Sequence, residues 1–209
     1  MTKVKLCGLS KPVDIEAANR LKPDYVGFVF AEKSKRYVIP EQALYLKKLL
    51  LPEIKAVGVF VNAGLSFVED LLVREVIDVA QLHGDESEAY IRALRESTGK
   101  PIIKAFKVKN PEDVKKAVLS EADMILLDAG DGSGMNFDWS LVKGVKRPFF
   151  LAGGLNHINV EEALREVEPY GVDVSSGIET DGVKDAIKME AFVKAVKKAL
   201  SKDSGKEMQ

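Results

Sequence analysis

Residues 56–75 read AVGVFVNAGLSFVEDLLVRE, and the two halves of this stretch follow different patterns. The first six residues form a short valine-rich apolar run, which is typical of a buried strand in a parallel sheet. Residues 67–75 place apolar side chains at helical spacing, and Ser66 with Glu69 predicts a capping box at the helix start. The stretch therefore predicts one strand, one turn and one helix.

The same unit recurs along the whole chain. Expected strands are 4–7, 25–30, 56–61, 79–83, 102–108, 124–128, 149–153 and 171–175, and expected helices are 14–21, 40–50, 67–75, 86–97, 111–118, 138–142, 159–167 and 189–200. Asn110 before Pro111 predicts a capped helix start, and the junctions at Pro40 and Asn159 follow the same logic. Strands that alternate with helices indicate parallel pairing, because parallel neighbours need a crossover.

Eight such units without a shift in composition predict an α/β fold, a single-domain (βα)₈ TIM barrel over residues 1–200 with a polar tail at 201–209. The alternative is an open doubly wound sheet. That fold usually carries a glycine-rich fingerprint after its first strand. Residues 7–12, CGLSKP, do not contain one.

Composition restricts the function classes. The 209 residues are 46% hydrophobic and carry a net charge of −1, so neither nucleic acid nor an anionic membrane is an expected partner. A single cysteine excludes an internal disulfide, and two histidines make no convincing zinc cluster. The apolar runs are too short to span a bilayer, and the first strand follows Met1 almost directly. We expect a cytoplasmic protein.

Inward-facing polar residues near strand ends are the first functional signal. Side chains alternate along a strand, so the pairs Lys5 and Cys7, Gln81 and His83, Met124 and Asp128, and Asp173 and Ser175 should each share the inner face. Leu6, Leu82 and Leu127 should then face the helices. Buried polar groups are costly unless they pair or serve a site, and barrel sites lie at the carboxyl ends of the strands.

Two small-residue turns indicate phosphate binding. Gly153 and Gly154 end the seventh expected strand, and Ser175, Ser176 and Gly177 end the eighth. The loops after these two strands often hold phosphate in barrel enzymes, because bare amides and hydroxyls can approach its oxygens. Glycines that merely serve tight turns are the alternative.

An acid and a base are expected across the barrel mouth. Cys7 ends the first strand and Asp128 the sixth, so the two should face each other on opposite sides of a small substrate. A lone cysteine is more often a core thiol, and Asp128 could be a turn residue. Lys5 either helps Cys7 to ionise or pairs with Asp173, and both interpretations stay open. The glycine-rich segment 129–134 is a candidate lid.

Seven motifs in order resemble one family. They are KLCGL at 5–9 (numbered from Lys5), GFVF with SKR at 27–36, QLHG at 81–84, LD at 127–128, GSG with FDW at 132–139, GGLN at 153–156 and DVSSGIE at 173–179. Together they resemble the phosphoribosylanthranilate isomerases over essentially the whole chain except the tail. The resemblance implies an Amadori rearrangement of N-(5′-phosphoribosyl)anthranilate in tryptophan biosynthesis, without metal or other cofactor, in a monomer or homodimer.

The resemblance also implies roles for single residues. Asp128 would protonate the furanose oxygen, and Cys7 would remove the C2′ proton. Arg36 would bind the anthranilate carboxylate, and Asp173 the ribose hydroxyls. The turns at Gly153–Gly154 and 175–177 would hold the phosphate, and the inward-facing His83 is included among the substrate-binding residues. Met135 and Asn136 depart from the usual Lys-Thr of the family, and the loop after Asp128 is short.

Two rival functions remain open. The first is a Schiff-base lyase or aldolase on the same scaffold, which would use an inward lysine such as Lys104 or Lys5. The second is a phosphosugar-binding protein that has the fold but not the chemistry. The presence of both Cys7 and Asp128 favours the isomerase.

Overall fold

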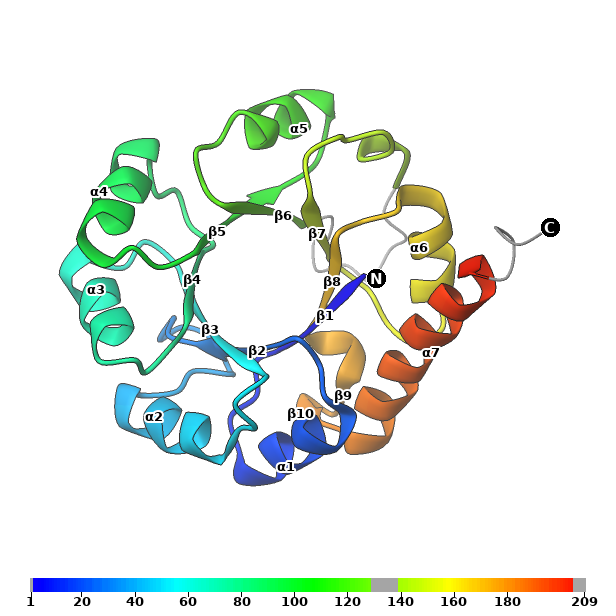
Figure 1. Cartoon of the computed structure of the whole chain (residues 1–209), viewed down its shortest axis with the longest axis horizontal. Coiled ribbons are helices and arrows are strands. Elements are labelled where there is room, and N and C mark those ends of the chain that lie inside the picture. Colours follow the sequence, from blue (N-terminus) through cyan, green and yellow to red (C-terminus); the bar gives the residue numbers. More distant parts are fainter. Residues whose placement is uncertain (1, 129–138, 205–209) are drawn as a thin grey trace.

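Eight parallel strands close into a ring, with helices around the outside (Figure 1). The computed structural model describes residues 2–128 and 139–204. The strands are β1 (Lys3–Cys7), β2 (Tyr25–Val29), β3 (Lys55–Phe60), β4 (Val79–Leu82), β5 (Ile102–Lys107), β6 (Met124–Asp128), β7 (Phe149–Ala152) and β8 (Gly171–Val174). They pair in chain order, and β1 closes the ring on β8 with Lys5 opposite Asp173. The (βα)₈ barrel is thus confirmed, and the open sheet is excluded.

The helices follow the predicted alternation with shifted ends. They are α1 (Pro12–Leu21), α2 (Pro40–Leu49), α3 (Leu65–Val73), α4 (Glu88–Thr98), α5 (Pro111–Val118), α6 (Val160–Val167) and α7 (Ala186–Ser204). Between β6 and β7 the described residues hold only the short 3₁₀ helix η1 (Trp139–Leu141), where a helix at 138–142 was expected. The first residue of that expected helix lies outside the described part. Helix α7 continues four residues into the segment that was expected as a tail.

Two predicted helix starts have different outcomes. Asn110 caps α5 as expected, because its Oδ1 accepts hydrogen bonds from the amides of Glu112 and Asp113. The capping box at Ser66 is wrong. Helix α3 begins at Leu65 after an extended Gly64 and has no side-chain cap, so Ser66 already lies inside the first turn.

Alternation along the strands separates two apolar layers. Leu6, Leu82 and Leu127 belong to the layer between sheet and helices, as predicted. The interior is filled by a smaller cluster that includes Val57, Val79, Ile103, Ala105, Leu126, Phe150 and Ala152. The buried polar residues Lys5, Gln81 and Asp173 also come from the strands of this ring. The barrel is therefore a packed core whose polar positions are few and specific.

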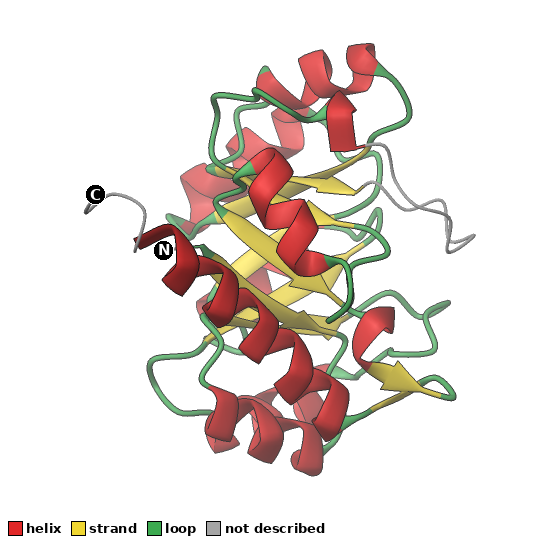
Figure 2. Cartoon of the chain, turned by 90° about the vertical axis from the view of Figure 1, so that its right-hand side faces the viewer, coloured by secondary structure: helices red, strands yellow, loops and turns green. Residues whose placement is uncertain are grey.

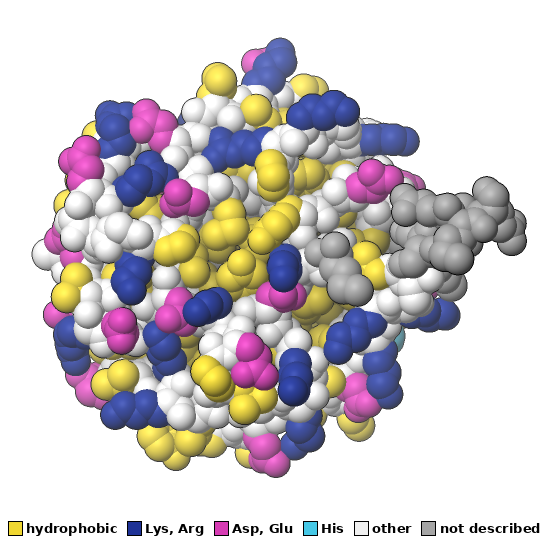
Figure 3. All heavy atoms as spheres, in the orientation of Figure 1, with side chains coloured by type: hydrophobic (Ala, Val, Ile, Leu, Met, Phe, Trp, Pro, Cys, Tyr) yellow, Lys and Arg dark blue, Asp and Glu magenta, His cyan; other side chains and the backbone are white. Residues whose placement is uncertain are grey.

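The two ends of the barrel differ in chemistry. At the end where the strands begin, Phe150 makes edge contacts with Tyr25 and Tyr170, each with ring centroids 5.5 Å apart. Burial raises the pKa of Tyr25 to about 12. Figure 3 looks onto this end and shows apolar side chains at the centre of the ring. The opposite end, where the strands finish, is the end at which barrel enzymes have their active sites.

The strand arrowheads in Figure 2 point to the end that also holds a small hairpin. This hairpin joins β9 (Glu179–Thr180) to β10 (Val183–Lys184) and follows the 3₁₀ helix η2 (Ser176–Ile178). Its turn residues Asp181 and Gly182 have φ of 52° and 78°. None of the described helices is long and apolar enough to cross a membrane.

Candidate active site

A cavity of about 480 Å³ lies at the carboxyl ends of the strands. Its lining includes nine of the ten residues that the sequence assigned to the site: Cys7, Arg36, His83, Asp128, Gly153, Gly154, Asp173, Ser175 and Ser176. The strand ends bring them together from positions up to 169 residues apart in the chain. Gly177, the tenth, is not in the lining.

Cys7 is the last residue of β1 and is 7% exposed. It packs with Val29 and Val59, and the absence of a side chain at Gly27 makes room for it, because a Cβ there would lie 2.7 Å from Sγ. Burial raises the pKa of the Cys7 thiol, and the nearby Lys5 cation opposes this without reversing it. Lys5 thus favours ionisation of Cys7, as one interpretation of the sequence expected, but burial outweighs this effect and the net shift of the Cys7 pKa is upward.

Lys5 and Asp173 form an ion pair across the closing strands. Lys5 Nζ lies 2.9 Å from Asp173 Oδ1, and the two side chains are 0% and 9% exposed. Burial alone would lower the pKa of Lys5, but the attraction of Asp173 and Cys7 raises it overall. The pairing interpretation of Lys5 is thus confirmed. Asp173 also lines the cavity.

Asp128 belongs to a chain of three polar side chains. His83 Nε2 lies 3.2 Å from Asp128 Oδ2, and His83 Nδ1 lies 3.1 Å from the amide nitrogen of Gln81. His83 was expected to bind substrate, and here it also contacts the candidate acid. Gln81 shares its strand face, as the spacing of two predicts.

Arg36 is held by the carboxylate of Glu179, which was not predicted to be a site residue. Its Nε and Nη2 donate to Glu179 Oε1 and Oε2 at 2.6 and 2.7 Å. Lys184 Nζ binds the same Glu179 Oε1 at 2.6 Å and the Ser175 carbonyl at 2.8 Å. One edge of the Arg36 guanidinium is therefore occupied, and no hydrogen bond of its Nη1 donors is seen among the described residues.

Glu179 and Lys184 sit on the β9–β10 hairpin, which was not predicted. The signal for it is present, since Asp181-Gly182 is a strong two-residue hairpin turn. Burial would raise the pKa of Glu179, but the hydrogen bonds from Arg36 and Lys184 hold it below its usual value. Burial lowers the pKa of Lys184 despite its pairing with Glu179.

The two small-residue turns lie side by side. Gly153 and Gly154 have φ of 92° and 67°, which only glycine adopts readily, so their amides are exposed without a side chain. A Cβ on Gly177 would lie 1.9 Å from the carbonyl oxygen of Leu155. Gly177 therefore lets the turn after β8 approach the turn after β7, and does not line the cavity itself.

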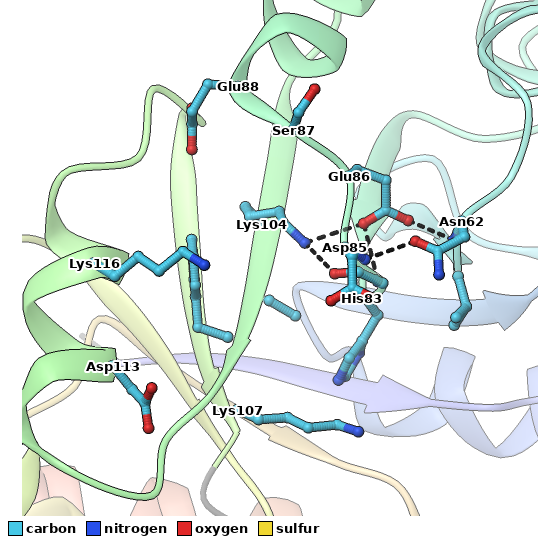
Figure 4. Close-up of a pocket in the computed structure, with 14 residues that line it drawn as sticks. Asn62, His83, Asp85, Glu86, Ser87, Glu88, Lys104, Lys107, Asp113 and Lys116 are labelled. Carbon is cyan, nitrogen blue, oxygen red and sulfur yellow. Dashed lines mark hydrogen bonds and ion pairs between the residues drawn. The ribbon is translucent and has the colours of Figure 1, made fainter.

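A second cavity of about 570 Å³ adjoins the first over β4 and β5, and His83 and Lys107 line both. Figure 4 shows Glu86 between Lys104 and Asn62, with Lys107 and Lys116 extending toward the cavity. Lys104 Nζ is 3.0 Å from Glu86 and 2.6 Å from the Gly84 carbonyl. Neither candidate Schiff-base lysine thus lies unpaired in the first cavity, because Lys104 lines only the second and Lys5 is paired with Asp173.

The expected lid at 129–134, the Met135-Asn136 departure and the Phe137-Asp138 motif all lie outside the described residues. No group of histidine, cysteine or acidic side chains within the described residues is suited to hold a metal ion.

Comparisons with known proteins agree with this geometry. Residues 4–195 match the family model described as N-(5′phosphoribosyl)anthranilate (PRA) isomerase. A protein of that name from Thermoanaerobacter sp. (strain X514) is 48% identical over 94% of this chain and 98% of its own. The crystal structure of phosphoribosyl anthranilate isomerase from Thermotoga maritima has a TM-score of 0.87 and 38% identity, covering 95% of this chain and 100% of that one.

A further solved structure is similar at a TM-score of 0.85 and 38% identity, again over 95% of this chain and 100% of that one. It is phosphoribosyl anthranilate isomerase in complex with reduced 1-(o-carboxyphenylamino)-1-deoxyribulose 5-phosphate.

Proposed function

The chain belongs to the N-(5′-phosphoribosyl)anthranilate isomerase family, which serves tryptophan biosynthesis, and from this premise we propose how its residues carry out the isomerisation. The observation that carries the proposal is that the single cysteine and Asp128 line one cavity from opposite sides of the strand ring. The substrate is a phosphoribosyl amine, so the site must hold a phosphate, a sugar and a carboxylate.

The proposed reaction consists of two proton transfers. Asp128 donates a proton to the furanose oxygen, the C1′–O bond breaks, and the nitrogen lone pair forms a protonated Schiff base. The thiolate of Cys7 then removes the proton from C2′, and the electron pair moves into the C1′–C2′ bond to give an enolamine. Tautomerisation yields the 2′-ketone. The protons move only among the acid, the base and the substrate, and the electron pairs stay within the substrate. The proposed reaction therefore needs no external oxidant or reductant.

Binding groups surround this pair. We assign the phosphate to the amides of Gly153 and Gly154 and the turn at Ser175 and Ser176, where glycine conformations leave the backbone accessible. Arg36 offers its Nη1 donors to the anthranilate carboxylate, because Glu179 already holds its other edge. Asp173 is placed to accept a hydrogen bond from a ribose hydroxyl.

A fluorescence assay tests the proposal, since consumption of phosphoribosylanthranilate by the pure protein removes its signal. Cys7→Ser and Asp128→Asn should each lower kcat by about two to four orders of magnitude, the usual contribution of a general base or acid. Asp70→Asn is the control, because Asp70 lies in an exposed ion pair on α3. Near-full turnover in Cys7→Ser would show that the base is assigned wrongly.

The cofactor-free chemistry has its own test. Protein that has been treated with a chelator and dialysed should keep its full rate, and borohydride should trap no substrate on a lysine. Loss of activity that a divalent metal restores would contradict the proposed mechanism. A borohydride adduct on Lys5 or Lys104 would favour the Schiff-base lyase instead.

A further inference from the structure

Gln81 is a buried amide in the wall of the candidate active site whose role the proposed reaction does not include. It lies in β4, is 1% exposed, and lines the same cavity as Cys7 and Asp128. Its Nε2 contacts His83, but its Oε1 has no hydrogen-bond partner among the described residues. Buried polar atoms are nearly always bonded, so an orphaned oxygen at a cavity wall indicates a missing donor.

The amide also determines the protonation of its neighbour. The Gln81 nitrogen can only donate, so His83 Nδ1 must accept, and the single proton of the neutral ring then sits on Nε2. That N–H points at Asp128 Oδ2, 3.2 Å away. Hydrogen bonds therefore run in one direction, from Gln81 to His83 to Asp128.

We propose that Gln81 binds the substrate through Oε1, which accepts a hydrogen bond from a sugar hydroxyl, while its Nε2 holds His83 in the Nε2–H tautomer. This inference rests on the proposed function for the identity of the sugar. Because Oε1 can only accept, its partner must donate a proton. Ionised phosphate and carboxylate groups cannot do so, whereas a ribose hydroxyl can.

The arrangement gives Gln81 a second effect on the reaction. Through His83, which donates to Asp128 Oδ2, the amide also contributes to the orientation of the Asp128 carboxyl group. Both ends of the amide are then in use when substrate is bound: Oε1 holds the sugar, and Nε2 holds His83, which contacts Asp128 Oδ2. Gln81 thus couples sugar binding to the orientation of the acid.

The tautomer of His83 in the ligand-free protein tests the first part of the proposal, that Gln81 Nε2 holds His83 in the Nε2–H form. The chain has only His83 and His157, so ¹⁵N-histidine NMR resolves both, and a His83→Asn sample assigns them. Wild-type His83 should be the Nε2–H tautomer, and Gln81→Met, which keeps the side-chain volume, should give a mixture. Gln42→Met is the matched control, because Gln42 is exposed on α2. An Nδ1–H tautomer in the wild type, or no change in Gln81→Met, would overturn the proposal.

Calorimetry with two ligands tests the second part of the proposal, that Gln81 Oε1 accepts a hydrogen bond from a sugar hydroxyl. One ligand is reduced 1-(o-carboxyphenylamino)-1-deoxyribulose 5-phosphate, and the other replaces the ribulose carbons by an alkyl chain of equal length without hydroxyls. The wild type should prefer the first by about tenfold or more, and Gln81→Met should reduce that preference by at least about threefold, as expected for one hydrogen bond. Circular dichroism confirms that the variant is folded.

The outcomes separate this inference from the proposed function. Equal preference in wild type and Gln81→Met overturns the role of Gln81, while turnover by the wild type keeps the isomerase assignment intact. A wild-type protein that binds neither ligand and does not turn over substrate overturns both.

Discussion

Cys7 combines the burial of a core thiol with a position in the candidate active site. As a lone cysteine it resembles an ordinary core thiol, and its burial supports that description. Its place at the end of β1, on the wall of the cavity that Asp128 also lines, supports its proposed role as the base. The same burial raises the pKa of the Cys7 thiol, while the neighbouring Lys5 cation acts in the opposite direction.

The first prediction concerns alkylation of Cys7. Iodoacetamide reacts with the thiolate, so its rate with the ligand-free protein should be half-maximal above about pH 8.5, the value for a free thiol. Lys5→Met should move the midpoint further up, because the Lys5 cation lowers the pKa of Cys7. Lys48→Met, on α2, should leave the midpoint unchanged. Mass spectrometry follows the single site, and a midpoint near neutral pH would refute the effect of burial.

The second prediction concerns Glu179 and acid stability. Arg36 and Lys184 hold the pKa of Glu179 below its unfolded value, so this carboxylate stabilises the fold above about pH 4.3 and stops doing so as pH falls through its folded pKa. Glu179→Gln should cost about 1.5–3 kcal/mol at pH 7, as for hydrogen bonds to a charged group. Urea unfolding should show this difference shrinking below pH 4, and a pH-independent difference would contradict it.

Among the secondary-structure elements, strand positions were easier to predict than helix starts. Short apolar runs bounded by turns mark each strand, and their observed ends differ from the expected ones by one residue at most. Helix starts were predicted correctly where a local signal such as Asn110 before Pro111 fixes them, and less well elsewhere. Ser66, for example, looked like a cap although α3 begins before it.

Short elements near the site were harder to predict than the helix starts. The β9–β10 hairpin has only two residues on each side, too few for a periodic pattern, although its Asp-Gly turn is readable. The close approach of the turns after β7 and β8 is equally invisible in the sequence. It depends on Gly177 meeting the backbone of Leu155, 22 residues earlier in the chain.

The third prediction tests that approach. In Gly177→Ala the new Cβ would lie 1.9 Å from the Leu155 carbonyl oxygen, which is backbone and cannot rotate away. We expect a loss of about 1–3 kcal/mol in unfolding free energy and weaker binding of phosphate ligands. The control is Gly64→Ala, where a Cβ meets nothing within 4 Å and the cost should stay below about 1 kcal/mol. Equal stability of the two variants would show that the turns can separate freely.

Closure of the barrel as a whole depends on β1 meeting β8. Lys5 and Asp173 lie opposite each other in that register and join residues 168 positions apart. The buried pair satisfies two charges that would otherwise be costly in an apolar interior. It also places the Lys5 cation next to Cys7. The same ion pair therefore lies at the closure of the barrel and near the candidate base.

The fourth prediction follows from this pair. Lys5→Met leaves Asp173 buried and uncompensated, and should cost about 3–5 kcal/mol of unfolding free energy in urea titrations. Lys5→Met with Asp173→Leu should recover most of that loss, because an apolar pair needs no compensation. Lys3→Met is the matched control, since its pair with Asp24 is half-exposed and should contribute at most about 1 kcal/mol. A stable single variant would contradict the structural role of the pair.

The amino-acid sequence by itself determined the eight strands, the inward face of four of them, and the identity of Cys7 and Asp128 as strand-end residues. These features depend on local periodicity, since alternation along a strand and apolar spacing along a helix need no distant partner. Only the tertiary structure decided that Lys5 pairs with Asp173, that Glu179 occupies one edge of Arg36, and that Gln81, His83 and Asp128 contact one another in a chain. Each of these contacts forms because closure of the ring brings strand ends that are distant in sequence to the same end of the barrel. Their energies depend on burial, which cannot be read from a local sequence pattern.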